Sequence, residues 1–210
     1  MEYACLTSDI VASRALPDRA AVQARIEGAL ADANVRFAAE LRVPLAITVG
    51  DEWQGLLGDP AAALEVAFHI ADLLHPIAIA SGIGVGEIAT GLRERTALMD
   101  GPCFHRARAG LDDARKIRGS ATVVRSEAER LDVPANAILR LLHAISERWT
   151  PRQLETVRAY QRHATEAAAA SSLGVSQPTV HQSLDRSLAK PYLEARAALV
   201  KLARSFAEGK

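Results

Sequence analysis

Residues 45–57, LAITVGDEWQGLL, decide the fold that this sequence predicts. Two apolar runs flank Gly50 and Asp51, and this is the pattern of two antiparallel strands joined by a tight turn. The predicted hairpin carries two acids at its tip, Asp51 and Glu52. On a strand, Glu52 is expected to point to the opposite face from Asp51.

The segments around this hairpin extend it into a split β-α-β pattern. Residues 3–10 predict a strand, and residues 18–41 predict a helix because apolar residues recur every three or four positions. Residues 60–74 predict a second helix. Residues 77–88 (IAIASGIGVGEI) predict a strand whose alternating glycines let a ligand or a helix approach one face closely.

A further helix at 102–118 and a strand at 121–125 complete the N-terminal pattern. The order predicts an α+β protein with a ferredoxin-like, palm-like antiparallel sheet and helices on one face. From residue 134 onward every segment has helical spacing, which predicts a following all-α domain. We therefore expect domains at 1–132 and 133–210, the second with helices at 135–149, 151–163, 165–173, 177–189 and 191–208.

The composition is that of an ordinary globular protein. Of 210 residues, 49% are apolar and 24% are charged, which excludes disordered and collagen-like chains. No apolar run approaches the roughly 18 residues of a membrane span, and no signal peptide is visible, so we expect a cytoplasmic protein. Residues 151–210 hold nine Lys/Arg against five Asp/Glu, and residues 1–150 hold sixteen against twenty. This weak asymmetry favours cation chemistry in the first part and polyanion contact in the second.

Asp9 and Asp51 are the candidate metal ligands. Asp9 ends the first strand and Asp51 lies at the hairpin tip, so in a ferredoxin-like sheet both carboxylates meet at one edge. Mg²⁺ and similar ions commonly use one or two carboxylates with substrate phosphates, and a pair of ions can serve phosphoryl transfer. The alternative is purely structural, with Asp9 capping a turn and Asp51 building the hairpin. Spacing leaves both interpretations open.

Residues 166–184 (EAAAASSLGVSQPTVHQSL) have the pattern of a helix-turn-helix. Ala170 is small where the helices cross, Gly174 permits a left-handed turn, and Ser176 caps the second helix. With residues 149–153 before it, the segment resembles sigma-like and response-regulator-like DNA-binding domains. The resemblance implies that duplex DNA is a partner. The implied base-reading residues are Gln177, Thr179, His181 and Gln182, and the implied phosphate contacts are Arg186 and Lys190.

The alternative for this segment is a helical hairpin used for dimerisation. The candidate reading helix is poor in Arg and Lys, so DNA affinity is expected to need a homodimer on two half-sites. An apolar stripe in residues 191–206 fits a dimerising or domain-packing helix.

Four motifs in the first 130 residues resemble the SatD family. They are residues 8–14 (SDIVASR), 50–55 (GDEWQG), 81–88 (SGIGVGEI) and 101–108 (GPCFHRAR). The family pattern is similar to class III nucleotide cyclases and GGDEF domains. The resemblance implies that Asp9 and Asp51 bind Mg²⁺ or Mn²⁺, with help from the carbonyl of Ile10.

The same resemblance implies a nucleoside triphosphate as ligand. Its phosphates are expected at the loop made by Ile10, Val11, Ala12, Ser13 and Arg14. Arg106 and Arg108 are expected to supply positive charge, because guanidinium groups match phosphate oxygens. The alternative for both arginines is a solvated helix face.

Two departures argue against the enzymes of these families. His105 stands at the position that resembles the cyclases' asparagine, and Ala109 at that of their arginine. Val49 and Gly50 replace the double glycine of GGDEF enzymes. We therefore expect a DNA-binding regulator whose cyclase-like domain binds a metal ion and a nucleotide. The alternatives are an active cyclase or nucleotidyltransferase with Asp9 and Asp51 as catalytic residues, and a non-catalytic dimeric scaffold.

Overall fold

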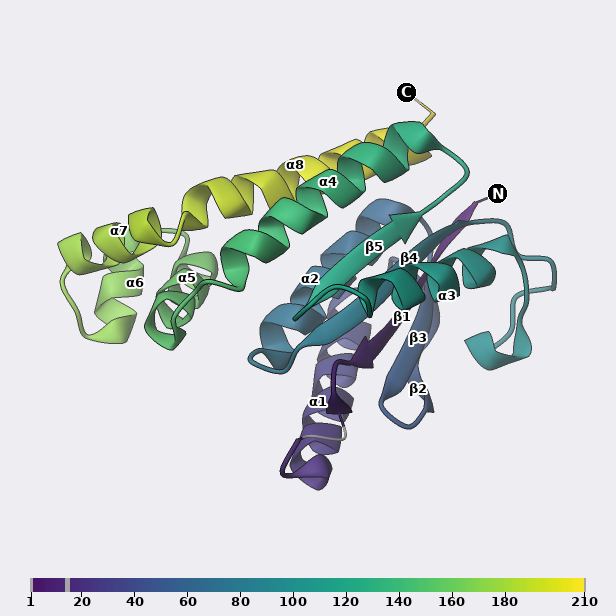
Figure 1. Ribbon diagram of the computed structural model, residues 1–210, viewed down its shortest axis with the longest axis horizontal. Helices are drawn as coiled ribbons and strands as arrows, with labels where there is room; N and C mark the ends of the chain where they lie inside the picture. The colour runs from purple at the N-terminus through teal and green to yellow at the C-terminus, as the bar shows by residue number, and fades with distance from the viewer. Residues whose placement is uncertain (1, 14–15, 210) are drawn as a thin grey trace. The chain divides into compact units, whose positions relative to one another are not determined.

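The computed structural model describes residues 2–13 and 16–209, so the expectation for Arg14 lies outside the described residues (Figure 1). By compactness the chain forms two units, residues 1–139 with 199–210, and residues 140–198. The prediction of functional domains at 1–132 and 133–210 stays a prediction. The elements in chain order are β1 (Tyr3–Ile10), α1 (Arg19–Arg36), β2 (Leu41–Val49), β3 (Glu52–Leu57), α2 (Pro60–Leu74), β4 (Ile79–Gly86), η2 (Thr96–Leu98), α3 (Pro102–Ala114), β5 (Ala121–Arg125), α4 (Glu129–Ser146), α5 (Pro151–His163), α6 (Glu166–Leu173), α7 (Gln177–Arg186) and α8 (Ala189–Ala207).

The sheet of the first unit has five strands in the order β2-β3-β1-β4-β5. Strand β1 pairs antiparallel with both β3 and β4, which confirms the α+β class and the split β-α-β order. The prediction of a purely antiparallel sheet is wrong, because β5 pairs parallel with β4. Helix α3 makes the crossover that such a parallel pair needs.

The prediction of helices on one face only is also wrong. Helices α1 and α2 and alternate strand residues such as Leu6 and Ile83 form the main core on one face. Helix α3 packs on the other face, where Cys5 contacts the cluster of Cys103 and Phe104. The expectation that the glycines of β4 admit a close neighbour is confirmed, and that neighbour is the backbone of α3.

Helix α1 is shorter than expected. The apolar spacing predicts a helix to Leu41, but α1 ends at Arg36 and Leu41 begins β2 opposite Leu57. Phe37 and Leu41 keep helical spacing, yet both pack on the main core from a turn and a strand. Tertiary packing therefore overrides the local period at this point.

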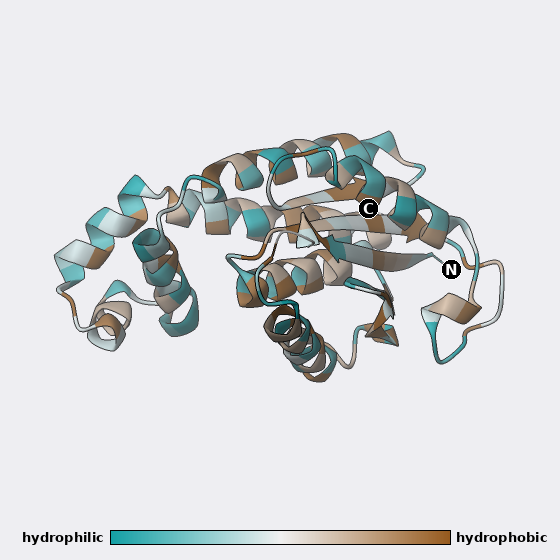
Figure 2. Cartoon of the chain, turned by 60° about the horizontal axis from the view of Figure 1, so that its bottom comes forward, coloured by the Kyte–Doolittle hydropathy of each residue, from teal (hydrophilic) through white to brown (hydrophobic). Residues whose placement is uncertain are grey.

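In the unit of residues 140–198, helices α5, α6 and α7 enclose a small apolar core. Figure 2 shows hydrophilic and hydrophobic residues side by side on these helices, as in amphipathic helices. Thr150, Thr165 and Ser176 cap the N-termini of α5, α6 and α7 through their side chains. The buried core residues are Val157, Ala159, Ala169, Ala170, Val180, Leu184 and Ala189.

The helices from α4 to α8 lie where the apolar spacing of the sequence predicts them, but several of them begin or end at different residues than expected. Helix α5 is as expected, α7 ends at Arg186, and α8 begins at Ala189. Helix α4 begins at Glu129 and contains Pro134, which the sequence placed before the helix. Asp132 stabilises this earlier start, because its carboxylate accepts from the backbone N–H of Ser126 at 2.9 Å. No helix among the described residues is long and apolar enough to cross a membrane.

Candidate functional site

The carboxyl groups of Asp9 and Asp51 lie together at one edge of the sheet. Asp9 stands near the end of β1, opposite Ala80 of β4. Asp51 follows Gly50, whose φ of +61° makes the tight turn between β2 and β3. Burial raises the pKa of Asp9 most, a hydrogen bond from Arg115 lowers it, and the charge of Asp51 and a hydrogen bond between the two carboxyls raise it. The net direction of the Asp9 pKa is upward, with burial as the largest cause and the neighbouring Asp51 as a smaller one.

A divalent cation fits this pair. Oδ2 of Asp51 is buried and has no hydrogen-bond partner, so a carboxyl oxygen is left unsatisfied at the pair. Among the described residues, no group of three or more His, Cys, Asp or Glu side chains could hold a metal ion. Mg²⁺ or Mn²⁺ at this point would therefore take carboxylate oxygens from Asp9 and Asp51 and its other ligands from phosphate and water.

Arg108 of α3 and Arg115, the residue directly after α3, reach the same edge. Arg108 donates to both carboxylate oxygens of Glu52, at 2.6 and 2.5 Å. Arg115 donates from Nε to Oδ2 of Asp9 at 3.0 Å, and one of its terminal nitrogens lies 3.6 Å from Glu52. Glu52 thus lies on the side of the sheet that faces α3, near Asp9, with its charge already paired.

Arg115 is a site residue that the sequence interpretation missed. Arg115 caps the C-terminus of α3 in helical conformation, roughly two helical turns after Arg108, and this spacing returns to the same helix face. That spacing was the available signal. The basic pair of this site is therefore Arg108 and Arg115.

Arg106 and His105 lie elsewhere. Arg106 donates to the carbonyl of Val85 at 2.6 Å and pairs with Glu127. Val85 is near the end of β4 that lies opposite the start of β1, so the structure does not bring Arg106 to Asp9. His105 contacts Asp100 through Nε2 at 2.7 Å.

The loop after β1 lies beside the carboxyl pair. The N–H of Val11 donates to Ala78 at 2.9 Å, so this amide is already used within the fold. Ala12 has a φ of +54°. Ser13 lines a hollow of about 120 Å³ with Gly50, Asp51 and Arg19 of α1. Arg19 is the second residue that sequence reasoning missed, and it places a cation in the lining of the same hollow as Asp51.

The raised pKa of Asp9 gives a prediction about pH. Because native Asp9 keeps its proton to a higher pH than in the unfolded chain, ionised Asp9 destabilises the metal-free fold at neutral pH. This destabilisation disappears as the pH falls through the raised pKa. Asp51→Asn removes the neighbouring charge, so we expect a higher melting temperature for the variant at pH 7 and a smaller difference at pH 4. Thermal melts in EDTA at both pH values measure this, and a variant that is less stable at pH 7 contradicts it.

The predicted DNA-contacting residues of α7 all lie exposed. These residues are Gln177, Thr179, His181, Gln182, Arg186 and, at the start of α8, Lys190. Val180 and Leu184 of the same helix are buried against α5 and α6. The helix therefore presents a polar outer face and an apolar inner face.

Two of these residues are tied to an acid of α6. Nδ1 of His181 lies 3.2 Å from Glu166, and Nζ of Lys190 lies 2.7 Å from the same carboxylate oxygen. The hydrogen bond from Lys190, and then that from His181, hold the pKa of Glu166 below its usual value. Gln177, Gln182 and Arg186 make no such ion pair within the described part of the chain.

Nearly the whole chain resembles one known protein family. The model of the SatD family matches residues 3–203, and no curated protein matches. A bacterial light-regulated adenylyl cyclase is 18% identical and has a TM-score of 0.42, over 55% of this chain and 71% of that one. The adenylyl cyclase CyaB from P. aeruginosa is 16% identical with a TM-score of 0.43, over 61% and 77%.

A regulator of polyketide synthase expression from Bifidobacterium adolescentis covers 96% of this chain and 86% of its own. Its identity is 15% and its TM-score is 0.27. All of these TM-scores lie below 0.5, so the structural likenesses carry no argument about what this chain does.

Proposed function

The chain belongs to the SatD family, and from that premise we propose that it is a DNA-binding regulator whose N-terminal unit binds a divalent metal ion and a nucleotide. The two activities reside in different units of the chain, the carboxyl pair in residues 1–139 and the helix pair α6–α7 in residues 140–198.

The observation that carries the DNA-binding half is the geometry of the connection between α6 and α7. Gly174 has a φ of +64°, and the N–H of Val175 donates to the carbonyl of Ala170 at 3.1 Å, which closes the first helix. Ser176 then accepts from the N–H of Thr179 and starts the second helix. A helix held in this way by one apolar face leaves its polar face available for the major groove.

The metal half of the proposal rests on the pair Asp9 and Asp51. Two adjacent carboxylates, one with an unpartnered buried oxygen, are poorly satisfied without a cation. Arg115 neutralises part of the charge, and Arg108, Arg115 and Arg19 are the cations that would be available to the phosphates of a metal-bound triphosphate. In such a complex, this chain's arginines orient the phosphates and its carboxylates hold the metal ion.

A second candidate function is an active nucleotidyl cyclase or nucleotidyltransferase. The observation that favours it is the same carboxylate pair, because two metal ions can be held by such a pair during phosphoryl transfer. Ala109 offers no side-chain charge to a transition state, and this weakens the second candidate. The non-catalytic scaffold requires that neither site binds a ligand, so either binding experiment below removes it.

DNA recognition is tested by substitution on the outer face of α7. A duplex is first selected from a random pool with the full-length protein. Gln182→Ala is then expected to lose about 1–3 kcal/mol of discrimination between the selected base pair and its replacements, because a base contact is removed. The matched control is Arg162→Ala, an exposed substitution near the end of α5. Fluorescence anisotropy with matched and mismatched duplexes measures the difference, and selection of no duplex at low salt contradicts DNA binding.

A further inference from the structure

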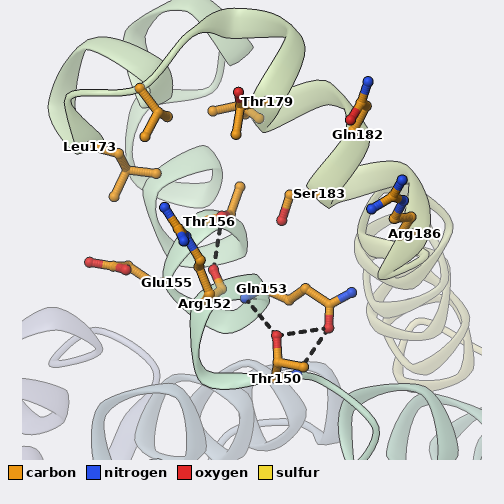
Figure 3. Close-up of a pocket in the computed structure, with 12 residues that line it drawn as sticks. Thr150, Arg152, Gln153, Glu155, Thr156, Leu173, Thr179, Gln182, Ser183 and Arg186 are labelled. Atoms are coloured by element: carbon orange, nitrogen blue, oxygen red, sulfur yellow. Dashed lines mark hydrogen bonds between the residues drawn. The ribbon is translucent and has the colours of Figure 1, made fainter.

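A groove of about 490 Å³ lies between helices α5 and α7 (Figure 3). Its lining includes the apolar side chains of Leu173, Val175 and Val180, and its other lining residues are polar. Three of the lining residues, Thr179, Gln182 and Arg186, also belong to the outer face of α7 that we propose for DNA recognition. The groove is therefore continuous with that face.

Two arginines stand on opposite walls of the groove. Arg152 comes from the first turn of α5 and Arg186 from the last turn of α7, and Figure 3 shows them on either side of the opening. Both are exposed, and neither guanidinium has an ion-pair partner among the residues that the structure describes. Two uncompensated guanidinium groups at one opening attract an anion with phosphate geometry.

The other polar groups of the groove are mostly satisfied within the fold. The hydroxyl of Thr156 donates to the carbonyl of Arg152 at 2.9 Å. The hydroxyls of Thr179 and Ser176 lie 2.8 Å apart. Glu155 is the one acid that lines the groove, and Figure 3 shows its carboxylate away from Arg186. The groove therefore carries two positive charges against one negative charge.

We propose that this groove seats the sugar-phosphate backbone of one DNA strand, with a phosphate held between Arg152 and Arg186. The inference rests on the proposed function and adds α5 to the DNA surface. A recognition helix needs phosphate contacts beside it. These contacts fix the position of the helix along the duplex, while the base contacts determine which sequence is bound. In this arrangement Arg186, in the last turn of α7, contacts the phosphate from one side. Arg152, in the first turn of the facing helix α5, contacts it from the other. The apolar lining residues of the groove, Leu173, Val175 and Val180, pack on deoxyribose carbons.

The test is the salt dependence of DNA affinity for the full-length protein. Each phosphate contact contributes about 0.9 to the slope of log K against log salt. Arg152→Ala and Arg186→Ala are each expected to reduce the slope by about 0.9, and the double variant by about twice that. Between 50 and 200 mM salt, each single variant therefore loses about 3.5-fold less affinity than the unsubstituted protein. Arg152→Lys is expected to keep most of the slope because it keeps the charge.

Arg162→Ala is the matched control, since Arg162 is an exposed arginine of the same helix that does not line the groove. Its slope is expected to stay unchanged. Glu155→Gln is expected to raise DNA affinity at low salt, whereas the two arginine variants lower it. The reason is that the substitution removes a negative charge that repels the phosphates. Circular dichroism melts of every variant verify that the helices remain folded.

The outcomes separate this inference from the proposed function. If the unsubstituted protein binds no duplex, both are overturned. If it binds DNA and Arg152→Ala has the slope of Arg162→Ala, the groove inference alone is overturned. A groove that binds only a free anion gives a third result. Inorganic pyrophosphate then binds the protein and loses affinity in Arg152→Ala, but it does not displace DNA, and Arg152→Ala keeps the DNA salt slope of Arg162→Ala. That result also overturns a backbone site.

Discussion

Gly84→Ala is expected to prevent stable folding of the N-terminal unit. A Cβ at this position would lie 2.1 Å from the carbonyl oxygen of Cys103 and 2.2 Å from the backbone nitrogen of Ala107. These are backbone atoms of α3, so no rotation of a side chain relieves the overlap. Because the whole helix must move off the sheet, we expect a loss of about 4 kcal/mol or more in unfolding free energy, against a total of about 5–15 kcal/mol for a domain. Urea denaturation followed by circular dichroism measures the loss.

Gly82→Ala is expected to behave in the same way, since its Cβ would meet the carbonyl oxygen of Ala107 at 2.0 Å. The matched control is Gly28→Ala in helix α1, where an added Cβ has no neighbour within 4 Å. Alanine there should stabilise the protein by up to about 1 kcal/mol, because it has the higher helix propensity. A Gly84→Ala protein as stable as the Gly28→Ala protein would show that α3 does not pack on β4 at this distance.

The glycines of β4 also show how far sequence reasoning reached for the fold. Their alternation correctly predicted one flat face, but the pattern did not say whether a ligand or a helix covers it. The error of placing all helices on one face follows from that gap. Periodicity identifies which face of an element is buried and does not identify the partner that buries it. The parallel pairing of β5 escaped prediction for the same reason, since it depends on the path of α3.

For the candidate site, the residues that could be predicted are those next to a turn in the backbone. Asp9 and Asp51 follow from strand order and a hairpin, both of which are local patterns. Arg115 and Arg19 could not be assigned in this way, because each reaches the site from a helix whose rotation depends on packing. Arg106 is the opposite case, a residue predicted for the site whose contacts lie elsewhere, since Arg108 donates to Glu52 while Arg106 donates to the carbonyl of Val85. Two positions along a helix differ by about 200° in direction.

In the C-terminal part, the pattern of small, turn and capping residues predicted α6 and the turn to within one residue, and it predicted α7 three residues too long. What the sequence could not give is the set of pairs made across helices. Glu166 holds His181 and Lys190, two of the six residues expected on DNA, whereas Arg186 has no ion pair with any residue that the structure describes. Side chains fifteen or more positions apart meet only once the helices are packed.

The binding of a nucleoside triphosphate with Mg²⁺ or Mn²⁺ is expected to disappear in Asp51→Asn. A ligand present at about 100 times its Kd stabilises the folded state by about 2.7 kcal/mol, so the unsubstituted protein should show a clear rise in melting temperature. Asn cannot supply the anionic oxygen that a carboxylate at Asp51 provides to a metal ion. Because the site has only two protein carboxylates, Asp51→Asn removes half of its negative charge. The rise should therefore vanish in the variant and also in the unsubstituted protein with EDTA. Thermal-shift titrations with ATP, GTP, CTP and UTP measure it.

Glu127→Gln is the matched control, because it makes the same change from acid to amide at the Arg106 pair, away from Asp9. It should keep the full metal-dependent rise. A loss of binding in Asp51→Asn cannot come from misfolding if this variant is also the more stable protein in EDTA at pH 7, as its relief of repulsion with Asp9 predicts. Chromatography of the nucleotide after incubation then separates the two candidate functions, since a regulator returns the triphosphate unchanged and a cyclase releases pyrophosphate with a cyclic nucleotide. Metal-dependent binding that survives in Asp51→Asn would remove the carboxylate pair from the site and leave the arginines of α3 to hold the phosphates alone.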